Sequence, residues 1–313
     1  MRHIVASILT VAIASAVVSG AVAVAAEGVL TGYQVLPSED GSFVVFYPPH
    51  LARMARDIER LIEESAREIK RELGLETIGT IKVILASDAK TYEVLHQGAI
   101  PEWGIAFSNL DPQVLGINVD LVVRNPRPLS SVLRHELAHL LLAQRVKGAA
   151  VPTWFTEGLA MKLAGEWSLS DEWRLMRLVG GRDIPYLEAL RGQFPRVEEE
   201  AAVCYGVSYC AVDKLLRDNP GTLLTLTAYL RDTGDFENSF ASTYGISTYE
   251  FGGKLYVEMD RRYRTAGIIL NASPYWGGAA LLFMAVFFAK RARNRRKLDQ
   301  WELEEKRERR IWY

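Results

Sequence analysis

Two histidines placed four residues apart are the side chains of this sequence best suited to chemistry. His135 and His139 lie in the stretch SSVLRHELAHLLL, residues 130–142. Its apolar residues keep helical spacing, and Ser130 and Ser131 offer an N-cap, so we predict a helix here. Residues four apart share one face of a helix, so both imidazoles can converge on a single metal ion.

Glu136 follows the first histidine directly and supplies a carboxylate at the same place. From that position it can reach a metal-bound water without ligating the metal itself. The His-Glu-x-x-His pattern is typical of zinc hydrolases. The alternative is a buried helix whose two histidines are hydrogen-bonded internally.

A zinc site needs a third protein ligand, and the segment PTWFTEGLA, residues 152–160, offers Glu157. Thr153 can cap a second helix, and a turn region at 147–151 would let the two helices lie antiparallel, with Glu157 near the histidines. The neighbours of Glu157 are apolar: Trp154, Phe155, Leu159 and Met161. We therefore expect a buried carboxylate, which needs a partner.

These two segments together resemble the gluzincin metallopeptidases, in particular the compact bacterial peptidase-MA-like family. The resemblance spans roughly residues 33–263, although only the two segments are specific. It implies a thermolysin-like arrangement in which an edge strand aligns an extended peptide, and the hairpin at 104–120 would be that edge. The zinc ligands that it implies are His135, His139 and Glu157, and the general base is Glu136.

Two positions depart from the thermolysin pattern. There, the residue four after the third ligand is a carboxylate that orients a ligand histidine, whereas here it is Met161. Support for the ligand histidine must therefore come from elsewhere. No histidine follows His139, so the oxyanion-stabilising histidine has no counterpart. Tyr205 matches a tyrosine position of this family and is the candidate replacement, because a phenol can donate to developing charge. The alternative is a core aromatic.

The elements that would position these residues, strands first and helices after, predict an α+β domain. The resemblance implies a thermolysin-like minimal metallopeptidase domain, with a small N-terminal sheet and helix followed by a mostly helical part. We expect strands at 43–47, 81–85, 104–108 and 114–120, and helical spacing predicts a helix over 51–75. Helices are expected to follow Pro128.

Composition and the two ends of the chain predict its organisation. The 313 residues carry 37 Lys+Arg against 38 Asp+Glu, so no global field marks a nucleic-acid binder. Two cysteines exclude a disulfide scaffold and a multi-cysteine zinc cluster. An uncharged stretch that ends in small residues indicates a signal peptide at 1–26, with an uncleaved anchor as the alternative.

A second uncharged stretch, 265–289, precedes a basic tail at 290–313 that holds ten basic and five acidic side chains. This pattern predicts a transmembrane segment plus a cytoplasmic tail, and an exported metallopeptidase-like domain at 27–264. The location expected is thus the cell membrane, single-pass, with the catalytic domain extracytoplasmic.

The sequence as a whole therefore predicts a membrane-tethered, zinc-dependent metallopeptidase. Its substrate would be a peptide or protein, and Zn²⁺ its cofactor, with Glu136 taking a proton from a zinc-activated water. Hydrolysis of a non-peptide ester or amide at the same site stays chemically open. The rival hypothesis is a catalytically silent, zinc-stabilised domain that binds a partner at the membrane.

Overall fold

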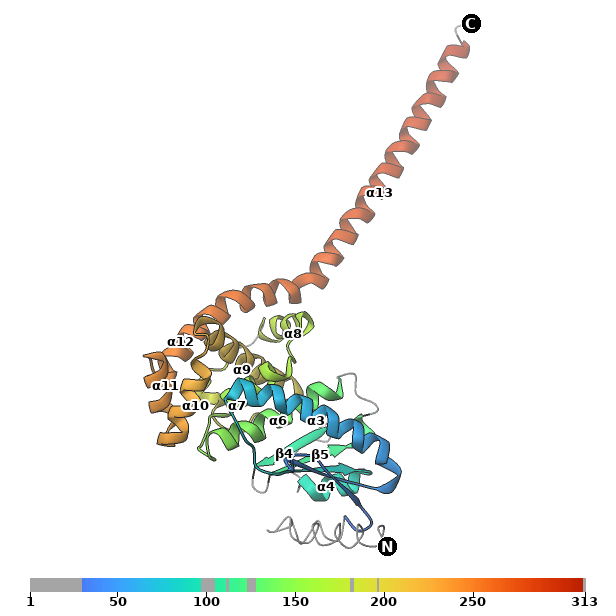
Figure 1. The fold of residues 1–313 in the computed structure, drawn as a ribbon. Helices are drawn as coiled ribbons and strands as arrows, with labels where there is room; N and C mark the ends of the chain where they lie inside the picture. Colours follow the sequence, from blue (N-terminus) through green and yellow to red (C-terminus); the bar gives the residue numbers. More distant parts are fainter. Residues whose placement is uncertain are drawn as a thin grey trace. The chain divides into compact units, whose positions relative to one another are not determined.

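The computed structural model describes residues 30–96, 105–110, 113–122, 128–180, 183–195 and 197–311 of the chain (Figure 1). This part of the protein is mostly helical, with one small sheet near its N-terminal end. The predicted signal peptide at 1–26 lies outside the described residues.

The sheet has five strands in the order β1-β2-β3-β5-β4, which puts β4 at one edge. β2 pairs with β3, and β3 with β5, in parallel, whereas β1 and β4 are antiparallel to their neighbours. The strand bounds are Gln34–Pro37 (β1), Phe43–Tyr47 (β2), Ile81–Ala86 (β3), Ala106–Leu110 (β4) and Gln113–Asn118 (β5). The sequence predicted four of these strands to within a few residues, and β1 was missed.

Helices cover both faces of the sheet (Figure 1). On one face α4 (Ala89–His96) packs its Tyr92 and Leu95 against Val44 and Ile84 in a shared apolar cluster. On the other face α3 (Ala52–Leu73) contacts β2, and α6 (Leu129–Arg145) contacts β4 and β5. Because both faces are covered, every residue of β2 is buried, as its continuous apolar run requires.

α3 is an amphipathic helix, as its sequence predicts. Its buried residues recur at helical spacing, with charged side chains on the opposite face. The helix ends at Gly74, whose φ of 63° is left-handed and whose N–H donates to the carbonyls of Arg71 and Lys70. Glycine takes this conformation without a steric penalty, which explains the stop at this residue.

The remaining regular elements of the described chain are helices. The longer helices are α7 (Thr153–Ala164), α8 (Leu169–Val179), α9 (Glu198–Asp218), α10 (Thr222–Thr233), α11 (Phe236–Tyr244), α12 (Thr248–Met259) and α13 (Thr265–Ile311). Short helical segments lie at Pro49–Leu51, Val119–Val122, Leu187–Leu190 and Asp260–Arg264, the last a π-helix.

α7 and α9 pack backbone to backbone at Gly158. A Cβ built on this glycine would lie 2.2 Å from the carbonyl oxygen of Ser208, which is fully buried. No side chain fits there, so the glycine after Glu157 sets how closely the two helices approach. On α7 the indole of Trp154 is buried among the rings of Phe155, Phe236, Phe240 and Phe251, which anchor the helix.

Two capping predictions were wrong. α6 begins after Pro128 and α7 after Pro152, and neither start has a side-chain cap. The hydroxyl of Ser131 instead donates to the carbonyl of Ala164, and that of Thr153 to the carbonyl of Arg191. Both hydroxyls therefore tie distant segments together. In each case proline at the N-cap already sets an extended entry to the helix.

The described chain divides into two compact units. The first reaches to Leu175 and resumes over Ile184–Glu258, and the second comprises Met176–Asp183 and Met259–Tyr313. Within the second unit α8 and α13 meet at two glycines, since a Cβ on Gly267 would lie 2.0 Å from the carbonyl oxygen of Met176 and 2.5 Å from the Cα of Gly180.

The predicted transmembrane segment at 265–289 is wrong, and so is the single-pass membrane location derived from it. No helix in the described ranges is both long and apolar enough to cross a membrane. Within α13 the longest apolar run without a polar residue or glycine is 279–289, after Asn271, Ser273 and Pro274. Eleven residues at about 1.5 Å each reach only about half of a bilayer core of roughly 30 Å.

Candidate metal centre

The site is built first by α6, which carries His135, Glu136 and His139. Leucines on the other side of this helix, among them Leu133, Leu137 and Leu140, are fully buried, so the two histidines face away from that core. The imidazole rings lie with centroids 5.0 Å apart and remain partly accessible, with 16 % and 15 % of their side-chain surface exposed. The predicted helix and its shared histidine face are both present.

α7 brings Glu157 to the two histidines. Its Oε2 lies 3.4 Å from Nε2 of His135 and 3.6 Å from Nε2 of His139. One ligand atom from each of the three residues lies within 4.8 Å of the other two. In the part of the chain that the structure describes, these three side chains form the one group that is arranged so that it could hold a metal ion.

The spacing of these atoms fits a tetrahedral metal better than direct hydrogen bonds. Hydrogen bonds between nitrogen and oxygen usually measure about 2.7–3.2 Å, shorter than either contact to Glu157. A tetrahedral zinc ion with bonds of about 2.0–2.2 Å keeps its ligand atoms roughly 3.3–3.6 Å apart. Two imidazoles and a carboxylate are also a donor set that zinc accepts, so the three residues fit such an ion.

When no cation is bound, the electrostatics of the cluster favour a positive charge on His135 and a negative charge on Glu157. Burial opposes the charged form of His135, but the carboxylates of Glu157 and Glu166 outweigh it and raise its pKa well above the usual range. Burial likewise opposes ionised Glu157, yet the imidazoles of His139 and His135 hold its pKa well below the ordinary value. The cluster thus centres on an anionic carboxylate that attracts positive charge.

Glu136 follows His135 directly on α6 and is not a member of this cluster. Its Oε2 accepts a 2.7 Å hydrogen bond from the hydroxyl of Ser108, which belongs to the edge strand β4. Ser108 points to the α6 side because its neighbour Phe107 faces the other way, over Gly116 of β5. The predicted hairpin therefore contributes an edge strand at the site, although its turn at 111–112 lies outside the described residues.

The second carboxylate at His135 was not foreseen. Glu166 Oε2 lies 3.0 Å from Nδ1 of His135, and only 7 % of its side chain is exposed. Met161 lacks the carboxylate expected at its position, and the sequence pointed to no particular replacement. No periodic signal indicates Glu166, because it lies just beyond the end of α7.

Tyr205 lies on α9, the helix packed most extensively against α7. Its ring makes an edge contact with Phe194, with centroids 5.1 Å apart. Burial raises the pKa of the Tyr205 hydroxyl above its ordinary value, and the negative charges of Glu157 and Glu136 raise it further. The phenol thus feels the field of the site and stays protonated, so it can donate a hydrogen bond.

Comparison with known proteins identifies the family of this chain. No curated protein matches this chain. A family model described as the Peptidase MA superfamily matches residues 87–254, which is more than half of the 313 residues. The match includes β4, β5, α6, α7 and α9, and so every element that brings a side chain to the cluster. This metallopeptidase-like chain belongs to the Peptidase MA superfamily.

Proposed function

We propose that this protein is a zinc-dependent metallopeptidase that hydrolyses peptide bonds, with its catalytic domain at residues 27–264. His135, His139 and Glu157 hold the zinc ion, and Glu136 is the general base. The observation that carries the proposal is the convergence of three ligand atoms within 4.8 Å of one another, with the two separations to Glu157 in the range of a tetrahedral ion. Glu136 follows the ligand His135 directly on the same helix.

A zinc ion bound by these residues supplies Lewis-acid chemistry, because it polarises the scissile carbonyl and acidifies water. The protein's own residues handle the proton. Glu136 accepts it from the attacking water and passes it to the leaving amine as the carbon–nitrogen bond breaks. The hydrogen bond from Ser108 to Oε2 holds the carboxylate in one orientation and leaves Oε1 to meet the water.

The substrate chain lies along β4 in an extended conformation. Among the described strands β4 pairs with β5 alone, and we propose that a peptide pairs with its other side. Since Ser108 belongs to β4 and touches Glu136, a peptide paired with this edge passes beside the base. The hydroxyl of Tyr205 donates to the oxyanion that develops on the attacked carbonyl.

A measurement on the wild-type protein tests the function. Purified protein is analysed for metals and incubated with a broad peptide library, with and without a chelator. We expect about one zinc per chain and cleavage that the chelator abolishes and added zinc restores. Zinc binding without cleavage of any peptide would instead support the silent, zinc-stabilised binding domain. Absence of zinc would refute the site itself.

A further inference from the structure

Glu166 occupies an unusual position for a buried carboxylate, directly after the end of a helix. α7 ends at Gly165, whose φ of 66° is left-handed, and the N–H of Glu166 then donates to the carbonyl of Met161 at 3.1 Å. This tight exit holds the Glu166 backbone next to the last turn of α7. The side chain is directed to α6, with 7 % of its surface exposed.

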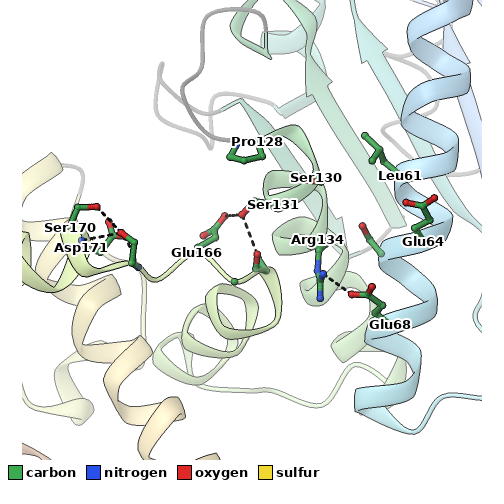
Figure 2. A pocket seen from close by; sticks show the side chains of 14 residues that line it. Leu61, Glu64, Glu68, Pro128, Ser130, Ser131, Arg134, Glu166, Ser170 and Asp171 are labelled. Carbon is green, nitrogen blue, oxygen red and sulfur yellow. Dashed lines mark hydrogen bonds and ion pairs between the residues drawn. The ribbon is translucent and has the colours of Figure 1, made fainter.

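Each carboxylate oxygen of Glu166 meets a different residue of α6. Oε2 lies 3.0 Å from Nδ1 of His135. Oε1 lies 3.5 Å from the hydroxyl of Ser131, which shares its one proton between Oε1 and the Ala164 carbonyl at 3.3 Å. Ser131 precedes His135 by four residues, so both face the carboxylate from one side of the helix. Figure 2 shows the Ser131 and Glu166 side chains directed toward each other.

This contact determines how His135 presents its other nitrogen. An ionised carboxylate can only accept, so Nδ1 of His135 carries the proton and donates it to Oε2. In the neutral ring Nε2 then has the free lone pair, and it is Nε2 that lies 3.4 Å from Glu157. The carboxylate thereby fixes the tautomer and the ring plane, and makes Nε2 a stronger donor to a cation.

Glu166 also borders a cavity, together with Ser131 of α6. The cavity measures about 570 Å³ and is lined mainly by polar side chains, including Glu64, Arg134 and Asp171 (Figure 2). Within this cavity Arg134 is paired with Glu68 at 2.6 Å.

We infer that Glu166 is the positioning residue of the zinc centre, taking the place of the carboxylate that is missing at Met161. The inference rests on the proposed function, because it assigns a role toward the zinc ion held by His135. Glu166 does not touch the metal. It acts through His135, by keeping Nδ1 protonated and Nε2 aimed at the ion.

The test measures zinc affinity by competition with a chromogenic chelator at one fixed pH. The variants are Glu166→Ala, Glu166→Gln, Ser131→Ala and the control Glu64→Ala, an exposed carboxylate of the same cavity. Loss of a carboxylate behind a ligand histidine typically costs about 10–100-fold in metal affinity, and we expect this for Glu166→Ala. Glu166→Gln keeps an acceptor for Nδ1 and should recover most of that loss. Ser131→Ala and Glu64→Ala should stay near wild type.

A spectroscopic readout separates positioning from simple structural support. In the cobalt-substituted protein, Glu166→Ala should shift the visible ligand-field bands, whereas Ser131→Ala should not. Equal zinc affinity in Glu166→Ala and wild type would overturn the inference and leave the proposed function intact. So would an equal loss in Ser131→Ala, since that would indicate a general clasp between α6 and the end of α7. A wild-type protein that binds no zinc would overturn both.

Discussion

The hydroxyl of Ser108 donates a 2.7 Å hydrogen bond to Oε2 of Glu136, and so joins the edge strand of the sheet to the histidine-bearing helix. The two residues are 28 positions apart in the chain. Because of this contact, the strand on which an extended peptide can pair is tied directly to the carboxylate that would activate water. Each part of this arrangement can be tested separately.

Ser108→Ala should reduce hydrolysis without releasing zinc. A hydrogen bond to a charged group contributes about 1.5–3 kcal/mol, so losing it in the transition state should lower kcat/KM by about 10–100-fold. Steady-state kinetics with parallel metal analysis provides the measurement. Ser87→Ala, which removes a hydroxyl bonded to the adjacent Asp88, is the control. Unchanged kcat/KM in Ser108→Ala would show that Glu136 needs no support from β4.

His139→Ala should lose zinc, because the two remaining ligands cannot hold a tetrahedral site. Metal analysis after dialysis should give well below one equivalent. His50→Ala, at an exposed position on the N-terminal side of α3, should keep full occupancy. Full zinc content in the His139→Ala protein would remove His139 from the ligand set.

Gly158→Ala should destabilise the protein even though alanine favours helices. The added Cβ would lie 2.2 Å from the Ser208 carbonyl oxygen, so α7 and α9 must separate, which typically costs about 1–3 kcal/mol. Gly253 is the matched control, because it is also helical but a Cβ added there would have no atom within 4 Å. Gly253→Ala should gain up to about 1 kcal/mol. Thermal or denaturant unfolding of both variants tests whether the two changes have opposite signs.

Tyr205→Phe should lower kcat and leave KM and zinc content nearly unchanged. Removing one oxyanion donor typically costs about 10²–10³-fold in kcat. Tyr209→Phe, four residues later on α9 and stacked on Trp167 at 4.5 Å, is the control and should retain activity. If Tyr205→Phe turned over at the wild-type rate, Tyr205 would be an ordinary core aromatic.

The cluster of His135, His139 and Glu157 was predictable from two short segments. The spacing of His135 and His139 fixes a shared helix face, and the apolar neighbours of Glu157 indicate its burial. Ser108 and Glu166 were not predictable in the same way. The contact of Ser108 depends on the register of β4 against β5, and that of Glu166 on the left-handed exit of α7 at Gly165. Neither leaves a periodic trace in the sequence.

Two further expectations failed for identifiable reasons. Serine or threonine before a helix predicted caps, but Pro128 and Pro152 set the helix starts, and the hydroxyl groups of Ser131 and Thr153 bind distant carbonyls. The uncharged stretch at 265–289 predicted a membrane span. This stretch is uncharged but not uniformly apolar, because polar residues interrupt its first half.

In the proposed mechanism Glu136 acts as a base and does not ligate the metal, and a zinc-loaded Glu136→Gln protein separates these two roles. The substitution is nearly isosteric, and its amide can still accept from Ser108, so fold and zinc content should match wild type. Hydrolysis of a peptide that the wild type cleaves should fall by about 10²–10⁴-fold. Wild-type hydrolysis by a fully zinc-loaded Glu136→Gln protein would contradict the mechanism.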